Sequence, residues 1–256
     1  MSNSAASTVP SHTAAEASGL AAAIKLRAGD IGFDLCGIAP AVSPGTFPDL
    51  QEWINRGYAG EMGYLERRTN AYADPDQVLR GVRSIIMLAE NYRGPDPPPR
   101  ESGQGRIARY ALPAVDYHDL LRGRLRQLAN FLHEHRPGCR TRGLVDTAPL
   151  LARDFARLSG LGWFGKNTML INRRLGSWLF LAALLTDVEL PPDAPHATDH
   201  CGTCTRCLDV CPTEAFPEPY VLDATRCISY LTIELRGPIP ELLQPQVGAG
   251  LLGCDP

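Results

Sequence analysis

The chain has 256 residues, of which 44% are hydrophobic and 21% charged, and its net charge is −3. This composition is typical of a folded globular protein with one large domain, or with one domain of roughly 150 to 200 residues and a small second one, and it excludes global disorder. No apolar run reaches the roughly 18 residues of a membrane span, and the N-terminus lacks the basic and then apolar pattern of a secretory signal. The sequence therefore predicts a cytoplasmic protein without membrane association.

The first half of the chain predicts alternating helices and strands. Residues 1–17 are small and polar without periodicity, which is typical of a disordered leader. A helix is expected over 18–28, and FDLCGIAP reads as a buried strand that ends at Pro40. RSIIMLAE, residues 83–90, predicts a strand that runs into a proline-rich loop. Apolar residues at helical spacing over 117–135 indicate an amphipathic helix.

The second half begins with GLVDTAP, a short strand whose end presents Asp146, and Pro149 is expected to start the next helix at its first turn. LGWFGKNTMLI and SWLFLAALLTD follow as a glycine-rich turn and two further strands. PPDAPHATDH, residues 191–200, has the composition of a domain linker. These elements predict a larger domain over 18–192 and a smaller one over 193–256.

Six of the eight cysteines lie after residue 200, whereas Cys36 and Cys139 stand alone and are expected to be structural. Residues 201–212 read CGTCTRCLDVCP, which is the C-x2-C-x2-C-x3-C-P spacing of bacterial ferredoxins. In that pattern three cysteines bind one cluster and the fourth binds a second one. Zinc is the alternative, but this density of cysteines followed by proline fits zinc poorly. The predicted ligands of iron–sulfur clusters are Cys201, Cys204, Cys207 and Cys211.

A second cluster at Cys211 needs further thiolates, and the other candidates are Cys227 and Cys254. Two clusters take about eight thiolates in all, whereas this region supplies six. Either the sequence is a shortened version of a longer protein or the clusters are incomplete.

The segment from Arg100 to Arg142 has a local excess of arginine, because it contains nine arginines and four acidic residues. Such a stretch contacts phosphates if the arginines share a face, and is otherwise a solvated helix surface. Lysine is rare, since Lys25 and Lys166 are the only two in the chain.

Several longer motifs resemble the epoxyqueuosine reductases: YAGEMGYLERR, RIARYA with DYHDLL, VDTAPLLARDFARLSGLGWFGKNTMLI, CGTCTRCLDVCPTEAF and LDATRCISYLTIE. Together they cover roughly residues 20–256. The resemblance implies an α+β fold, in which a nitroreductase-like cobalamin-binding domain precedes a ferredoxin-like domain with two [4Fe-4S] clusters. It also implies reduction of epoxyqueuosine to queuosine in tRNA, by electrons that pass from the clusters to cobalamin.

The resemblance also implies roles for individual residues. The aspartate of VDTAP is the proposed proton donor of the family, which carries over to Asp146; by itself, Asp146 could equally cap the following helix. A carboxylic acid donates a proton near neutral pH if partial burial raises its pKa. Lys166 and Asn167 in the glycine-rich turn, Arg109 in RIARYA and Ser229 in CISYLTIE are expected to contact cobalamin, although a plain turn also explains Lys166 and Asn167.

DYHDLL contains the start of an Asp-x-His cobalamin-binding signature, but the glycine that this signature needs is absent. His118 is therefore expected to be a helix residue, with cobalamin held without a histidine ligand. The family implies tRNA and an external low-potential electron donor as partners of a monomer. It normally continues past GCD with two more cysteines.

Two other classes of function stay open at this point. A ferredoxin-like electron carrier would not need the VDTAP and GLGWFGKNT regions. A relative of the reductive dehalogenases, acting on a small organic substrate, would share cobalamin and paired clusters.

Overall fold

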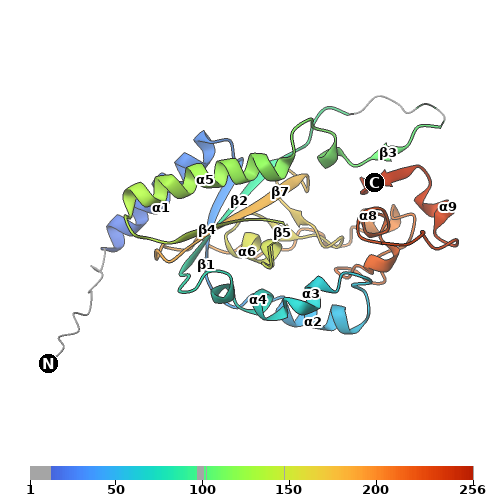
Figure 1. The fold of residues 1–256 in the computed structure, drawn as a ribbon, viewed down its shortest axis with the longest axis horizontal. Coiled ribbons are helices and arrows are strands. Elements are labelled where there is room, and N and C mark those ends of the chain that lie inside the picture. Colours follow the sequence, from blue (N-terminus) through green and yellow to red (C-terminus); the bar gives the residue numbers. More distant parts are fainter. Residues whose placement is uncertain (1–12, 97–100, 102, 147, 256) are drawn as a thin grey trace.

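The computed structural model describes residues 13–96, 101, 103–146 and 148–255 and is built around a four-stranded antiparallel sheet (Figure 1). The strands are β1 (Leu35–Pro40), β2 (Ser84–Asn91), β4 (Thr141–Val145) and β7 (Leu179–Thr186), in the order β1-β2-β7-β4. The strands predicted at FDLCGIAP, RSIIMLAE, GLVDTAP and SWLFLAALLTD are the four strands of this sheet. The mixture of sheet and helices confirms the predicted α+β class.

Both faces of the sheet are buried, because helices cover each side (Figure 1). On one face α1 (Ala14–Asp30) and α5 (Tyr117–His135) pack on Ile86 and Leu88 of β2. On the other face α6 (Ala152–Leu158) packs on Ile85 and Met87. Successive side chains of a strand point to opposite faces, so an unbroken apolar run such as IIML suits a central strand that is covered twice.

Helix α1 begins earlier than the sequence predicts. Thr13 caps it, since the Thr13 hydroxyl accepts from the Glu16 amide and the Glu16 carboxylate accepts from the Thr13 amide. This capping box satisfies two amide groups at the helix start. Residues 14–17 are therefore helical rather than part of a leader, and the rest of the predicted leader, 1–12, lies outside the described residues.

Helix α6 begins later than the sequence predicts. Its first residue is Ala152 and its N-cap is Leu151, which makes no side-chain capping bond. The predicted start at Pro149 is wrong, and so is the idea that Asp146 caps this helix. The described residues between the end of β4 and the start of α6, Asp146 and 148–151, form a loop.

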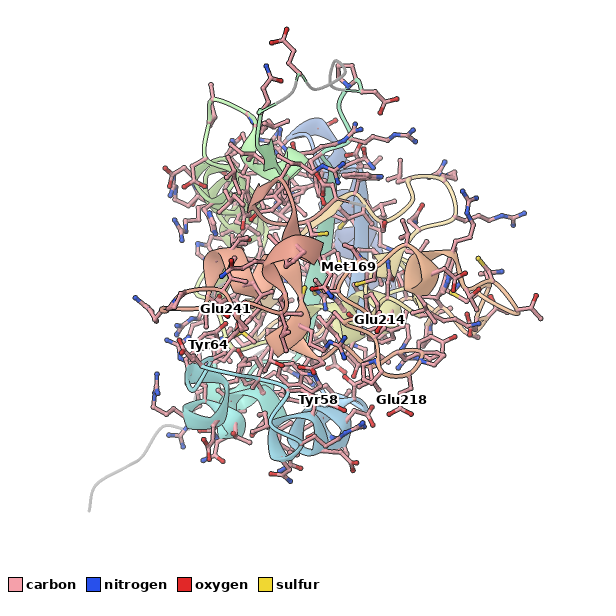
Figure 2. The ribbon with its side chains drawn as sticks, turned by 90° about the vertical axis from the view of Figure 1, so that its right-hand side faces the viewer. Tyr58, Tyr64, Met169, Glu214, Glu218 and Glu241 are labelled. Carbon is pink, nitrogen blue, oxygen red and sulfur yellow. The ribbon has the colours of Figure 1, made fainter. Side chains whose placement is uncertain are left out.

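Short helices, α2 (Phe47–Asn55), α3 (Tyr64–Arg67), α4 (Thr69–Ala73) and η1 (Pro75–Gln77), join β1 to β2. They pack against the cysteine-rich segment, which we define as residues 201–255. The Tyr230 hydroxyl accepts from the Glu61 amide at 2.8 Å, and Arg56 pairs with Glu218 at 2.9 Å. Figure 2 shows Tyr58, Tyr64 and Glu218 along this boundary.

The cysteine-rich segment contains α7 (Arg206–Asp209), η3 (Ala224–Arg226), α8 (Ile228–Ile233), α9 (Gln244–Val247) and β8 (Gly250–Leu252). Strand β8 pairs in parallel with β3 (Arg106–Ile107), which precedes η2 (Arg109–Ala111). The Ala108 amide also donates to the Leu252 carbonyl at 2.8 Å. These bonds tie the end of the segment to the part of the chain that leads into α5 (Figure 1).

A small hairpin, β5 (Trp163–Phe164) and β6 (Leu170–Ile171), follows α6 and corresponds to the predicted turn region LGWFGKNTMLI. Across 13–96, 103–146 and 148–255, no helix is long and apolar enough to cross a membrane.

Candidate functional site

A cavity of about 400 Å³ lies beside the sheet, between the start of α5, the loop 146–151, α6 and the β5–β6 hairpin. Its wall is mostly apolar and includes Phe164, Met169 and Phe180. Polar side chains join the lining at Thr46, Tyr117, Asp146, Arg153, Asp154 and Ser177. An apolar hollow with a few polar groups is the usual form of a small-molecule or cofactor site.

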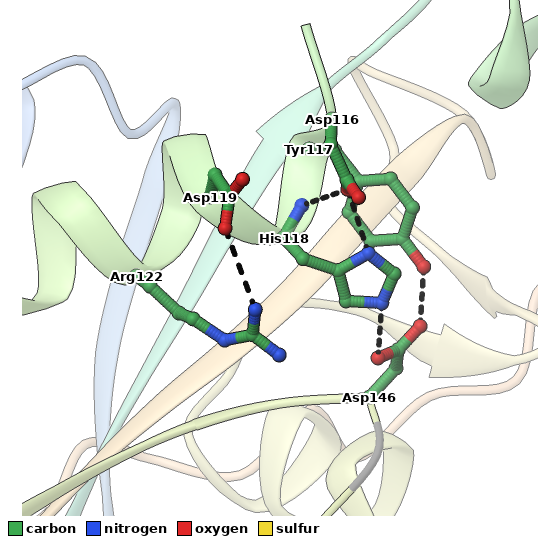
Figure 3. A network of polar contacts seen from close by, with 6 residues as sticks. All are labelled: Asp116, Tyr117, His118, Asp119, Arg122 and Asp146. Atoms are coloured by element: carbon green, nitrogen blue, oxygen red, sulfur yellow. Dashed lines mark hydrogen bonds and ion pairs between the residues drawn. The ribbon is translucent and has the colours of Figure 1, made fainter.

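Asp146 follows β4 directly, and its carboxylate is held by two consecutive residues of α5 (Figure 3). The Tyr117 hydroxyl donates to Oδ2 of Asp146, and His118 Nε2 lies 2.9 Å from Oδ1. The other ring nitrogen of His118, Nδ1, lies 2.8 Å from Asp116 Oδ1. The four residues form a continuous chain of hydrogen bonds that ends at the cavity.

Packing fixes the orientation of these groups. The Tyr117 ring stacks on Phe180 with centroids 4.2 Å apart and on His118 at 4.0 Å. Burial, and then the hydrogen bond to Asp146, raise the pKa of Tyr117, so its hydroxyl stays protonated and donates. The His118 side chain is 23% exposed and that of Asp146 is 49% exposed. The carboxyl thus lies at the accessible end of a rigid hydrogen-bonded chain.

The cavity lining also includes Arg153, which is exposed. Its neighbour Asp154 is buried and already bonded to the Thr46 amide at 3.1 Å and to Arg157 at 3.1 Å. Within 13–96, 103–146 and 148–255, no acidic side chain pairs with Arg153. This guanidinium is therefore available to a carbonyl or anionic group of a ligand.

The six cysteines of the segment fall into two groups of three. The pKa of Cys207 is raised by burial and then by the charges of Cys201 and Cys204. Burial, and then the charges of Cys227 and Cys211, raise the pKa of Cys254 to about 11. Cys201, Cys204 and Cys207 thus lie near one another, as do Cys211, Cys227 and Cys254. Their assignment as cluster ligands stays a prediction.

In the described part of the chain, no three Cys, His, Asp or Glu side chains converge tightly enough to hold one metal ion. The Ala215 amide donates to Cys211 Sγ at 3.3 Å, a bond that stabilises negative charge on sulfur.

Cys36 and Cys139 pack against the core beneath α1 and α5. Burial raises the pKa of the Cys36 thiol to about 12. Both positions agree with the structural role that the sequence predicts.

Lys166 and Asn167 lie at the tip of the β5–β6 hairpin, outside the cavity lining. The Lys166 ammonium donates to the carbonyl oxygens of Gly202 at 2.7 Å and Cys204 at 3.0 Å. The Asn167 side chain accepts from the Met169 amide at 3.2 Å and so closes its own turn, while Thr168 has a φ of 64°.

Arg109 and Ser229 also lie outside the lining. Arg109 pairs with Asp96 at 2.7 Å and lies over the Trp178 ring, 4.9 Å from its centroid. Its backbone amide donates to Asp255. Ser229 is in α8, two residues after Cys227. The cobalamin contacts expected for Lys166, Asn167, Arg109 and Ser229 stay predictions.

Sequence reasoning missed Tyr117 and His118 as partners of Asp146. His118 is the second residue of α5, as predicted for a helix residue, but it also faces the end of β4. The DYH triplet was the only sequence feature that drew attention to these residues, and it does not indicate a contact with residue 146.

Much of the arginine excess serves intramolecular pairing. Arg124 pairs with Glu90, Arg140 with Asp187 at 2.9 Å, and Arg122 with Asp119 at 3.5 Å.

Comparison with known proteins identifies the family. Residues 73–147 match the family model "Epoxyqueuosine reductase QueG, DUF1730", and residues 200–256 match "4Fe-4S double cluster binding domain". The second match confirms the prediction of an iron–sulfur domain over the zinc alternative.

Curated relatives carry the same name along nearly the whole chain. An epoxyqueuosine reductase from Escherichia coli strain K12 is 41% identical over 240 residues, which are 92% of this chain and 63% of that protein. One from Gloeobacter violaceus is 44% identical over 238 residues, 92% of this chain and 73% of that protein. The chain therefore spans somewhat less than two thirds of the Escherichia coli relative.

Solved structures agree in fold. A crystal structure of epoxyqueuosine reductase with an epoxyqueuosine-modified tRNA-Tyr stem loop has a TM-score of 0.80 and 33% identity, covering 93% of this chain and 63% of that one. A Bacillus subtilis epoxyqueuosine reductase, with its catalytic aspartate loop swung out of the active site, has a TM-score of 0.81, the same 33% identity and the same coverage of both chains. The sequence, the two family models and the fold agree: the chain belongs to the epoxyqueuosine reductase family.

Proposed function

We propose that this chain is the reductase part of an enzyme that converts epoxyqueuosine to queuosine in tRNA. The reaction takes two electrons and two protons, removes the epoxide oxygen as water and leaves an alkene. The names of the relatives and the stem-loop complex of one of them support this substrate. An external low-potential donor would supply the electrons, and the protein would act as a monomer in the cytoplasm.

The observation that carries the proposal is the position of Asp146. Its carboxyl lies at the cavity and is held by Tyr117 and His118. An epoxide oxygen that leaves carbon develops negative charge and needs a proton at that moment. In this proposal Asp146 donates that proton, and His118 and Asp116 form the path by which it is replaced.

The residues that line the site fit the two cofactors of the family. Each cysteine group supplies three of the four thiolates that a [4Fe-4S] cluster takes. The cavity offers an apolar wall at Phe164 and Met169 for the flat ring of cobalamin, and Ser177 and Arg153 for its amide side chains. Bound there, cobalamin would supply a strong reductant for the epoxide carbon, with electrons from the clusters.

Two bonds from α5 bear on how the Asp146 carboxyl is kept at the cavity. The Bacillus subtilis relative has a catalytic aspartate loop that is swung out of the active site. In this chain Asp146 faces the cavity, and both bonds to α5 favour that position. We infer that these bonds hold the carboxyl at the cavity while the proton is delivered.

A ferredoxin-type electron carrier is a weaker alternative, because such a carrier needs no cavity beside a four-stranded sheet. The arginines between 100 and 142 are weaker candidates for phosphate contacts than the sequence suggests, since several of them pair within the chain.

The test replaces Asp146 by Asn in the full-length protein, reconstituted anaerobically with iron, sulfide and cobalamin. Modified nucleosides are then released from the tRNA and measured by mass spectrometry. The Asp146→Asn protein should retain its cofactors and form no queuosine.

The matched control is Asp119→Asn, which removes a carboxylate from the start of α5. The Asp119 side chain is 78% exposed and pairs only with Arg122 in the described chain. It should keep full activity. Wild-type turnover in the Asp146→Asn protein would refute the role of Asp146, and failure of the wild-type protein to form queuosine would refute the function.

A further inference from the structure

The β5–β6 hairpin contacts both the cavity and the cysteine-rich segment. Its strand residues Phe164 and Leu170, together with Met169, line the cavity. At its tip, Lys166 bonds to the segment through both its backbone and its side chain. The Tyr220 amide donates to the Lys166 carbonyl at 2.9 Å, and the ammonium donates to the carbonyls of Gly202 and Cys204.

These bonds hold the loop between Cys201 and Cys204 from one side, and Asp199 holds it from the other. The Asp199 carboxylate accepts from the Cys201 amide at 2.8 Å and from the Tyr220 hydroxyl. One anion and one cation therefore bracket the loop of the first cysteine group.

We propose that Lys166 is a positioning and tuning residue for the first cluster, the one bound by Cys201, Cys204 and Cys207. The inference rests on the proposed function only in that a cluster forms at these cysteines. The ammonium fixes the two carbonyl groups of the ligand loop, and its charge stabilises the reduced cluster. It thereby raises the reduction potential of the cluster next to the hairpin that lines the cavity.

The physical reason is the charge of the cluster. Reduction adds one negative charge, and a cation held at a fixed position favours the state with more negative charge. Lysine suits this task as a compact point charge, and two carbonyl acceptors prevent it from moving into solvent. Another cation, Arg206 at the start of α7, lies next to Cys207 in the sequence. It is exposed and makes no ion pair within 13–96, 103–146 and 148–255, so solvent screens its charge more strongly.

The size of the effect follows from Coulomb's law. A unit charge on the order of 10 Å from the cluster, at an effective dielectric constant of about 20, changes the reduction equilibrium roughly tenfold. For a one-electron couple a tenfold change corresponds to about 59 mV. Removal of the charge should therefore lower the midpoint potential of this cluster by about 60 mV.

Three variants of the anaerobically reconstituted full-length protein separate charge from hydrogen bonding. Lys166→Arg keeps the charge, Lys166→Gln keeps a donor without charge, and Lys166→Met loses both. Arg173→Met, an exposed arginine of the β6–β7 turn, controls for the change in net charge. Midpoint potentials come from redox titrations followed by electron paramagnetic resonance.

In the Gln and Met variants, one of the two cluster midpoint potentials should fall, and the other should stay at the wild-type value. In Lys166→Arg and Arg173→Met, both midpoint potentials should stay at the wild-type value. Unchanged midpoints in both uncharged variants would overturn the tuning role. Absence of clusters in the wild-type protein would count against the proposed function instead.

A cluster-free measurement tests the positioning role separately. In metal-free protein, Lys166→Met should raise the rate at which iodoacetamide alkylates Cys201 and Cys204 several-fold, with the rate at Cys227 unchanged. Equal rates in wild-type and variant protein would overturn the positioning role, even if the variant takes up no iron.

Discussion

Replacing Tyr117 by Phe removes one hydroxyl from the site and leaves the rest of its packing. The ring would still stack on Phe180 at 4.2 Å and on His118 at 4.0 Å. The Asp146 carboxylate would lose its Tyr117 donor and keep His118 Nε2 at 2.9 Å. The substitution therefore tests whether the hydroxyl holds the catalytic loop.

The expected cost follows from the exposure of the carboxylate. A hydrogen bond to a charged group contributes about 1.5 to 3 kcal/mol, and a group open to water lies at the low end of that range. The Asp146 side chain is 49% exposed, so we take about 1.5 kcal/mol. This energy corresponds to about a tenfold lower rate of the step that needs the Asp146 carboxyl at the cavity.

The assay is a single-turnover conversion of epoxyqueuosine in a tRNA stem loop, with enzyme in excess and cobalamin and iron content measured on the same sample. Tyr110→Phe is the control, because Tyr110 contacts the Tyr117 ring edge-on at 6.2 Å and its hydroxyl makes no hydrogen bond in the described chain. A Tyr117→Phe rate within twofold of wild type, at equal cofactor content, would refute the reasoning.

Two further predictions concern the scaffold and the clusters. Gly37→Ala should lower the thermal unfolding midpoint, because a Cβ there would lie 2.2 Å from the Ser159 carbonyl oxygen. The expected loss in the free energy of unfolding is roughly 1 to 3 kcal/mol or more. Gly29→Ala, with open space around it, should not lower the midpoint. Cys254→Ala, in a form of the protein that carries the two further cysteines expected past GCD, should reduce the iron content from about eight to about four atoms per chain, because Cys254 is grouped with Cys211 and Cys227, whereas Cys139→Ala in the core should leave it unchanged.

The sequence predicted elements well where their pattern is local. The bounds of α5 are those given by its apolar spacing, and the four sheet strands lie where β-branched and apolar runs predict them. Boundaries that depend on capping were less accurate. Pro149 is compatible with a first helical turn, yet α6 starts at Ala152, and its N-cap Leu151 makes no side-chain capping bond.

The candidate site was only partly predictable, because its contacts join distant parts of the chain. Asp146 was predicted from its motif, but its partners come from the start of α5, whose position is set by packing on the sheet. Lys166 was predicted to contact cobalamin, whereas its ammonium bonds to carbonyl groups 36 and 38 residues later in the chain. No periodicity within either segment reports such a contact.

The GLGWFGKNT motif forms much of the β5–β6 hairpin, and the geometry of this hairpin explains the glycine at residue 162. A Cβ at Gly162 would lie 2.2 Å from the Ile171 carbonyl oxygen, so only glycine allows the strands to approach this closely. That approach sets Phe164 and Met169 against the cavity and Lys166 against the loop of the first cysteine group. A single tight hairpin thus fixes the wall of the cavity and the nearest cluster loop relative to each other. In the proposed function cobalamin would bind at the cavity and a cluster at this loop, so the constraint on residue 162 would also constrain the separation of the two cofactors.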